Sequence, residues 1–262
     1  MIGIFDSGIG GLTVVKEIFK HLPEYQTVYF GDTARTPYGN KSKETIIKYA
    51  IQDTEFLLEK EAKIIVVACN TASAVAADEL EKKYPDIPIF EVITPAVSKA
   101  IKVTNNKHIG VIGTRATIDS HIYEDKIKSA KGGFKIVSQP CPLFVPLVEE
   151  GWIKKPVTKI IAKTYLRPLK LQQIGALILG CTHYPLIKNI IQEKIGKRVT
   201  LVDPAEQVAL QVKQFLTDNP NLEKTLEKND RHEFYFSDIA PHLSQLVQQW
   251  LGEKIKLQLH NI

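Results

Sequence analysis

The 262-residue sequence contains few cysteines, no long apolar run and no block of like charges. Its three cysteines are too few, and odd in number, for a disulfide framework, so we expect reduced thiols and a cytoplasmic location. No apolar stretch approaches the roughly 20 residues that a membrane-spanning helix needs, so we expect no membrane association. The opening MIGIFDSGIGG lacks the basic leader and apolar core that are typical of a signal peptide.

The charge balance argues against a nucleic-acid partner. The formal net charge is +5, and Lys and Arg are spread along the chain rather than gathered in one run. Apolar residues make up 44% of the chain and charged residues 24%, which is typical of globular proteins and excludes intrinsic disorder. At about 150 residues per domain, the length predicts one or two domains.

Short runs rich in Ile and Val alternate with longer amphipathic stretches. The expected strands are residues 2–5, 27–30, 64–68, 87–90, 108–112, 135–138, 175–179 and 198–201. The expected helices are residues 12–20, 43–61, 72–84, 118–130 and 157–171. Such strands separated by helices predict βαβ units, and hence an α/β fold whose mostly parallel sheets are flanked by helices.

A weak internal repeat indicates two related halves. The run IGI at residues 2–4 precedes a later strand that ends in VVACNTA, and IGV at residues 109–111 precedes, at a similar distance, a strand that ends in LILGCTHYP. We therefore predict two pseudosymmetric domains with the cysteine-bearing strand ends facing each other. Ligands of open α/β sheets bind at the carboxyl ends of strands, so the active site would lie in the cleft between the domains.

The predicted first domain comprises residues 1–95 and 206–262, and the second comprises residues 96–205. The chain would leave the first domain at EVITPAV and return at LVDPAEQVA. The return segment is expected to form a helix over residues 206–216, a strand over 233–236 and a last helix over 241–251.

Cys69 and Cys181 occupy matching positions at the ends of two aliphatic strands. Cys69 is followed by Asn70-Thr71 and an alanine-rich helix, and Cys181 by Thr182-His183. A cysteine at a helix N-terminus lies at the positive end of the helix dipole, which favours the thiolate. A single free cysteine is more often a buried packing residue, but two in matching positions indicate function.

The FDSGIGG loop places Asp6 and Ser7 at the end of the first expected strand. Its glycines let the backbone turn tightly and expose N–H groups to an anion. Two explanations stay open: the two side chains cap the following helix, or they belong to a binding site. Nucleotide binding is disfavoured, because DSGIGG matches neither the dinucleotide fingerprint nor the P-loop.

Further polar candidates stand in loops that contain glycine or proline. They are Asp32, Tyr38 and Gly39 in YFGDTARTPYG, Thr114 and Thr117 in VIGTRAT, and Glu149 and Glu150 in PLVEEG. Taken singly, each is better explained as a turn former or a solvated charge. Cys141, between prolines in QPCPLF, is assigned to packing.

His183 follows Cys181 by two residues, so the two side chains can share a polar pocket. Zinc held by Cys69, Cys181 and His183 is disfavoured, because the CxxC and HxxxH spacings of structural zinc sites are missing.

Two equivalent cysteines, one from each half, match a reaction with two-fold symmetry of its own. Inversion of a stereocentre is such a reaction, since a base removes a proton from one face while an acid delivers one to the other.

With these residues in view, the sequence resembles a known family, the cofactor-independent glutamate racemases of the aspartate/glutamate racemase superfamily. The segments that carry the resemblance are IGIFDSGIGGLTV, YFGDTARTPYG, VVACNTASA, VIGTRAT, CPLFVPLVEEGW, LGCTHYPL and LVDPAEQVA, in the family's order. The resemblance implies an enzyme that interconverts L- and D-glutamate without a cofactor or metal, and that supplies D-glutamate for peptidoglycan synthesis. It also implies a homodimer.

By position, the resemblance makes Cys69 and Cys181 the two acid/base thiols, with Cys181 acting on L-glutamate and Cys69 on the D isomer. Asp6 would support Cys69, and His183 would support Cys181. Glu149, preferred to Glu150, would be a further catalytic carboxylate, and Asp32 an auxiliary group. The implied substrate contacts are Asp6, Ser7, Tyr38, Gly39, Asn70, Thr71, Thr114, Thr117, Thr182 and His183.

Three other interpretations of these residues stay open. A racemase for aspartate or another amino acid would share the scaffold. A cysteine hydrolase would use Cys181 and His183 alone. A binder of amino acids or anions would need neither cysteine. Beyond about residue 217 the resemblance weakens, because FYFSDIAPHL stands where the family often has a Gly-Asp turn.

Overall fold

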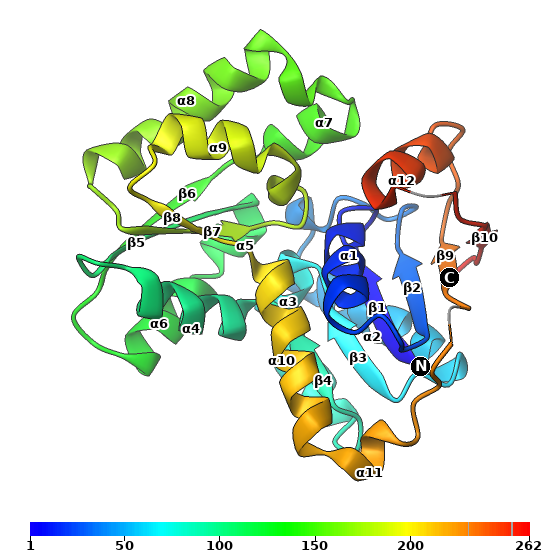
Figure 1. The fold of residues 1–262 in the computed structure, drawn as a ribbon. Coiled ribbons are helices and arrows are strands. Elements are labelled where there is room, and N and C mark those ends of the chain that lie inside the picture. The colour runs from blue at the N-terminus through cyan, green and yellow to red at the C-terminus, as the bar shows by residue number, and fades with distance from the viewer. Residues whose placement is uncertain (230, 253) are drawn as a thin grey trace. The chain divides into compact units, whose positions relative to one another are not determined.

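The computed structural model describes residues 1–229, 231–252 and 254–262. They form two compact units, one made of Met1–Val92 with Ala205–Ile262 and the other of Ile93–Pro204 (Figure 1). Each unit contains its own parallel sheet covered by helices, which confirms the predicted α/β class. No helix among the described residues is both long and apolar enough to cross a lipid bilayer.

The first unit contains a six-stranded sheet in the order β10-β9-β2-β1-β3-β4. Its strands are β1 (Ile2–Asp6), β2 (Thr27–Gly31), β3 (Ile64–Val67), β4 (Ile89–Glu91), β9 (Glu233–Phe236) and β10 (Leu257–Leu259). Strands β1, β2 and β3 are buried along their whole length, which explains why they read as unbroken apolar runs rather than as alternating patterns.

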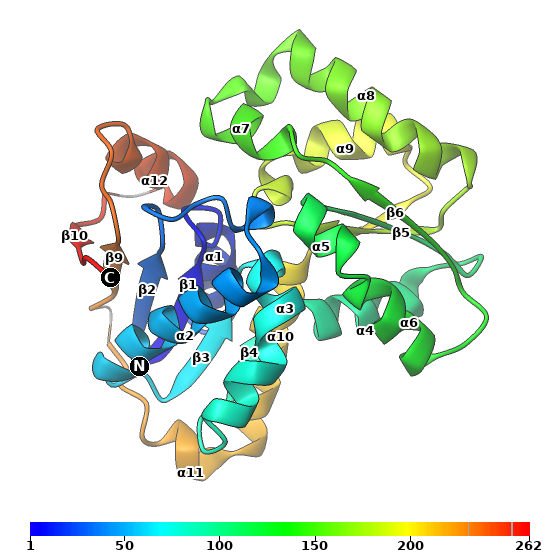
Figure 2. The same ribbon diagram turned by 180° about the vertical axis from the view of Figure 1, so that it is seen from behind.

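Helices cover both faces of this sheet. They are α1 (Leu12–His21), α2 (Lys43–Glu59), α3 (Asn70–Lys83), α10 (Pro204–Asp218), α11 (Pro220–Glu223) and α12 (Leu243–Leu251), with a 3-10 turn η1 (Tyr38–Asn40). Figures 1 and 2 show α2 and α3 on one face and α1, α10 and α12 on the other. Ser42 is the N-cap of α2, and its hydroxyl accepts a hydrogen bond from the backbone N–H of Thr45.

The second unit contains a four-stranded sheet in the order β6-β5-β7-β8. Its strands are β5 (His108–Gly113), β6 (Lys135–Pro140), β7 (Ala176–Gly180) and β8 (Thr200–Val202). Its helices are α4 (Ile93–Val103), α5 (Arg115–Asp119), α6 (Ile122–Ala130), α7 (Phe144–Glu149), α8 (Pro156–Leu171) and α9 (Lys188–Ile195), with 3-10 turns η2 (Trp152–Lys154) and η3 (Tyr184–Ile187). Helices α4 and α6 pack together on one face, and α8 and α9 on the other.

The predicted helix over residues 118–130 is wrong as a single element. The chain forms α5 and α6, and His121 between them has a left-handed backbone with φ 57°. A left-handed residue cannot continue an α-helix, and no Gly or Pro announces this break in the sequence. Each of the other predicted strands and helices begins and ends within two residues of an observed one. The sequence analysis did not predict α4, α7, α9, α11 and β10.

The weak sequence repeat corresponds to a repeated sheet topology. The four strands β2-β1-β3-β4 of the first unit and β6-β5-β7-β8 of the second have the same order along the chain and across the sheet. Phe5 of β1 lies opposite Val67 of β3, and Gly113 of β5 lies opposite Gly180 of β7. Each cysteine of interest therefore follows the third strand of its unit, at the carboxyl edge.

Candidate active site

Cys69 follows β3 and forms the N-cap of α3, as the sequence predicted. Only 5% of its surface is exposed, and its thiol donates to the Ser7 hydroxyl over an Sγ–Oγ distance of 3.4 Å. The dipole of the 14-residue helix α3 has its positive end at this sulfur. Negative charge on the sulfur is therefore stabilised.

Asp6 is the last residue of β1, directly before Ser7, and its side chain is fully buried. Its carboxylate accepts from the backbone N–H of Gly8 at 3.1 Å. The N-cap of α1 is Gly11, so the alternative in which Asp6 and Ser7 cap that helix is wrong. A Cβ on Gly11 would lie 2.5 Å from the Cβ of Asp6, so glycine lets α1 begin close to the carboxylate.

Tyr29 links Asp6 and Cys69 electrostatically. Its hydroxyl donates to the backbone carbonyl of Gly8 at 2.8 Å. Burial raises the pKa of this hydroxyl, and negative charge at Asp6 and at Cys69 raises it further. The carboxylate and the thiol therefore share one buried neighbourhood with a neutral phenol.

Asn70 and Thr71 are the first two residues of α3 and are almost completely buried. Backbone N–H groups in the first turn of a helix have no intrahelical partner. Together with the Ser7 hydroxyl, this edge of the first unit is suited to binding a carboxylate.

Asp32 lies just past β2, where its carboxylate is fully occupied. Arg35 Nε donates to Oδ2 at 2.6 Å, Tyr38 donates to the same oxygen at 2.5 Å, and Ser237 donates to Oδ1 at 2.8 Å. The Tyr38 hydroxyl also lies 2.8 Å from Oδ2 of Asp53. The Tyr38 side chain therefore points into the protein, and only the backbone of Tyr38 and of half-buried Gly39 is left for a substrate.

Asp53, Arg35 and Ser237 were not singled out by the sequence analysis. Asp53 lies on the face of α2 that also carries Ile46, Ala50 and Leu57, all buried. An acidic residue at helical spacing within an apolar face is the signal that could have found it. Ser237 comes from the return segment and has no comparable local signal.

Cys181 follows β7 in the second unit and is 6% exposed. Its Sγ lies 3.8 Å from Nδ1 of His183, and Nε2 of the same ring lies 2.9 Å from Oε1 of Glu149. Glu149 is the last residue of α7, whereas Glu150 is exposed. The structure thus brings Glu149, rather than Glu150, to the histidine.

The charge of His183 follows from these two contacts. Burial lowers the pKa of His183, but hydrogen bonds to Cys181 and Glu149 and their negative charges outweigh burial and raise the pKa to about 10. At neutral pH both ring nitrogens therefore carry hydrogens, one facing the Cys181 sulfur and one facing Glu149. An imidazolium in this position stabilises a thiolate at Cys181.

Thr114 directly follows β5. By the strand register it lies beside Cys181, just as Ser7 lies beside Cys69 in the first unit. Its Oγ1 accepts from the backbone N–H of Thr117 at 3.3 Å and so caps α5. Thr117 is buried, and Thr182 is 7% exposed. Three hydroxyls therefore stand at the carboxyl edge of the second sheet, which suits hydrogen bonds to a carboxylate.

Cys141 lies just past β6 and is completely buried. Burial, and then the charge of Cys181, raises the pKa of the Cys141 thiol well above its ordinary value. This thiol stays protonated and acts as a packing group. Among the described residues, no group of three or more His, Cys, Asp or Glu side chains is arranged to hold a metal ion.

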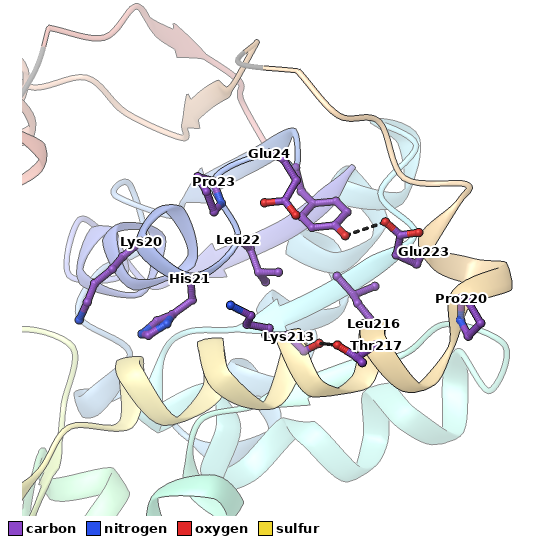
Figure 3. Close-up of a pocket in the computed structure, with 11 residues that line it drawn as sticks. Lys20, His21, Leu22, Pro23, Glu24, Lys213, Leu216, Thr217, Pro220 and Glu223 are labelled. Carbon is purple, nitrogen blue, oxygen red and sulfur yellow. Dashed lines mark hydrogen bonds between the residues drawn. The ribbon is translucent and has the colours of Figure 1, made fainter.

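A pocket of about 610 Å³ lies elsewhere in the first unit, at the end of α1 (Figure 3). Its lining residues are Lys20, His21, Leu22, Pro23, Glu24, Tyr25, Lys213, Leu216, Thr217, Pro220 and Glu223. Tyr25 donates to Glu223, another lining residue, at 2.7 Å. None of the predicted site residues lines this pocket.

Comparison with known proteins bears on the chemistry of these residues. A model of the family described as Asp/Glu/Hydantoin racemase matches residues 10–212. A glutamate racemase from Geobacter metallireducens is 46% identical over 254 residues, covering 97% of this chain and 93% of that protein. These matches confirm the resemblance inferred from the sequence.

Solved structures agree with the sequence relatives. A glutamate racemase isoform from Bacillus anthracis superposes with a TM-score of 0.94 at 36% identity, covering 100% of this chain and 97% of that one. A glutamate racemase from Francisella tularensis, in complex with D-glutamate, has a TM-score of 0.91 at 41% identity and covers 100% of this chain and 96% of that one.

Proposed function

The chain belongs to the Asp/Glu/Hydantoin racemase family, and from this premise we propose that it is a glutamate racemase with Cys69 and Cys181 as its two acid/base groups. The observation that carries the proposal is the equivalent position of the two cysteines. Each is buried at the carboxyl edge of a four-strand core of the same topology, next to a hydroxyl residue and to groups that stabilise sulfur charge.

In the direction from L- to D-glutamate, the Cys181 thiolate removes the α-proton, and the Cys69 thiol delivers its proton to the opposite face of Cα. Cys181 ends as thiol and Cys69 as thiolate, so the reverse reaction exchanges their roles. The proposal requires one sulfur to reach each face of Cα. Different devices stabilise the two thiolates: the imidazolium of His183 at Cys181, and the N-terminus of α3 at Cys69.

The starting protonation of Cys69 has a local basis. Its S–H donates to Ser7, and the buried carboxylate of Asp6 lies in the same neighbourhood. A nearby negative charge favours the neutral thiol, whereas the helix N-terminus favours the thiolate. These opposed effects suit a group that must both give and take a proton, since efficient acid/base catalysis needs both forms near working pH.

The two carboxylates of glutamate are matched by hydroxyl and N–H donors in both units. In the first unit we assign substrate binding to Ser7, Asn70, Thr71 and the backbone at Tyr38-Gly39. In the second unit we assign it to Thr114, Thr117, Thr182 and His183. Donors fixed before the substrate binds can stabilise the carbanion that forms at Cα without a cofactor.

Glutamate is preferred to aspartate as substrate because the relatives at 36–46% identity are glutamate racemases, one of them bound to D-glutamate. We further propose that the enzyme is a cytoplasmic homodimer whose D-glutamate serves peptidoglycan synthesis. Wild-type protein should then restore growth of a bacterial strain that depends on added D-glutamate, and sedimentation should give twice the mass of the 29.4 kDa chain.

The decisive experiment incubates the purified protein with L-glutamate in deuterated buffer without added cofactor or metal. Circular dichroism should show loss of optical activity while NMR shows loss of the α-proton. Cys69→Ser and Cys181→Ser should each reduce turnover by about 10²–10⁴-fold, the usual contribution of an acid/base group. Racemisation by Cys69→Ser at nearly the wild-type rate would contradict the two-cysteine mechanism, and glutamate affinity without turnover would favour a binding protein.

A further inference from the structure

Tyr38 has one hydroxyl hydrogen but faces two carboxyl groups. Its oxygen lies 2.5 Å from Oδ2 of Asp32 and 2.8 Å from Oδ2 of Asp53, and both aspartates are completely buried. One hydrogen cannot form good hydrogen bonds to both oxygens, and a buried acceptor without a donor is costly. The arrangement therefore has one hydrogen too few if both carboxyls are ionised.

The charges of this buried cluster lead to the same conclusion. Arg35 supplies one positive charge, with Nε donating to Asp32 at 2.6 Å and Nη2 to Asp53 at 2.8 Å. Its Nη1 donates to the neutral amide of Gln52 at 2.6 Å, and Ser237 adds a neutral donor to Asp32. Two ionised aspartates would thus leave a net negative charge in the interior, which is strongly unfavourable.

We propose that Asp53 is a neutral, protonated positioning residue of the glutamate site. Its Oδ2–H donates to the Tyr38 oxygen, and the Tyr38 hydroxyl donates to ionised Asp32. Oδ1 of Asp53 then accepts from Arg35 as a carbonyl oxygen. Every short contact in the cluster acquires one hydrogen, and a single negative charge, on Asp32, balances Arg35.

The chain of hydrogen bonds holds the segment between β2 and α2 at two points, Asp32 and Tyr38. Asp32 is the first residue after β2, and Tyr38 begins η1, whose backbone is assigned to the substrate under the proposed function, on which this inference rests. Asp53 anchors Tyr38 to α2, and Ser237 anchors Asp32 to the return segment. Asp32 therefore also acts through position rather than as an auxiliary acid or base.

The electrostatic surroundings of Asp53 support the same proton. Burial raises the pKa of Asp53, and the neighbouring charge of Asp32 raises it further. Arg35 and the Tyr38 hydroxyl lower this pKa, and the charge of Asp6 adds a smaller increase. Burial and the charge of Asp32 outweigh the groups that favour the carboxylate, so the pKa of Asp53 lies well above its ordinary value.

The first test compares three variants by their kinetics with glutamate. Asp53→Ala should raise KM about tenfold with a smaller change in kcat, because it removes a buried hydrogen-bond partner from a positioning group. Asp53→Asn should recover most of the loss, since an amide N–H can donate to Tyr38 and an amide oxygen can accept from Arg35. Asp32→Asn should not be tolerated in this way, because it leaves Arg35 without its anion. Equal damage in Asp53→Asn and Asp53→Ala would overturn the proposal.

The second test observes the proton directly and does not depend on activity. Infrared difference spectra of wild type minus Asp53→Asn at neutral pH should contain the C=O band of a protonated carboxyl group. A carboxylate band in its place would overturn the proposal, whether or not Asp53→Ala folds. If the wild type does not racemise glutamate, the proposed function fails, while this band still decides the protonation of Asp53.

Discussion

Nε2 of His183 lies 2.9 Å from Oε1 of Glu149, a residue 34 positions earlier in the chain, while Nδ1 of the same ring faces the sulfur of Cys181. One ring thus connects the end of α7 to the cysteine that follows β7. The carboxylate keeps the imidazole charged and fixes its orientation. Under the proposed mechanism, Glu149 therefore supports the Cys181 thiolate through His183.

Glu149→Gln is expected to change how stability depends on pH. The folded-state pKa of His183, about 10, lies above the ordinary value of 6.5, so protonation stabilises the fold below about pH 6.5. That stability is lost as pH rises from there through about 10. Removing one anionic partner lowers the folded-state pKa, so thermal melts of Glu149→Gln should decline less over this window. The neighbouring Glu150→Gln is the matched control, and curves of equal slope for all three proteins would contradict the prediction.

Under the proposed mechanism, His183→Asn should slow proton transfer at Cys181, and Asp6→Asn should slow proton transfer at Cys69. Because the two enantiomers have equal free energy in water, each variant must lower kcat/KM by the same factor in both directions. Isotope effects separate them: with α-deuterated L-glutamate the effect should rise in His183→Asn, since removal of the proton by Cys181 becomes limiting. With α-deuterated D-glutamate it should rise in Asp6→Asn. If the isotope effects rise with the opposite enantiomers, the roles proposed for the two cysteines must be exchanged.

Gly11→Ala should destabilise the first unit. The added Cβ would lie 2.5 Å from the Cβ of Asp6, so either α1 or Asp6 must move. We expect a loss of about 1–3 kcal/mol in the free energy of unfolding, measured by urea denaturation, together with reduced turnover. Gly132→Ala, where a Cβ meets nothing within 4 Å, should change stability by less than about 0.5 kcal/mol.

Cys141→Ala tests the distinction between the three cysteines. This thiol is buried and kept protonated, and it donates to the backbone carbonyl of Gln139 over an Sγ–O distance of 3.5 Å. Racemisation should continue at nearly the wild-type rate, with a loss of about 1 kcal/mol in unfolding free energy from the small cavity. A loss of turnover comparable to that of Cys181→Ser would show that Cys141 participates in the chemistry.

The local sequence pattern was sufficient to predict the buried strands and the helices that have one apolar face. The apolar runs in β1, β3, β5 and β7 predict buried strands, and the amphipathic stretches between them predict helices that cover the sheets. The position of Cys69 at a helix N-terminus also follows from the sequence, because the aliphatic strand ends there and a helix-forming segment begins. These features depend on neighbours a few residues away.

Tertiary structure decided everything that depends on distant partners. Glu149 rather than Glu150 faces His183 because of where α7 ends against the loop after β7, and Asp53 joins Asp32 because α2 packs beside the end of β2. The break at His121 and the short strand β10 likewise lack a local signal. The amino-acid sequence determines which chemical groups the protein carries and which strands present them. Long-range packing determines which groups meet, and with it their charge, because burial and a partner's charge set a pKa.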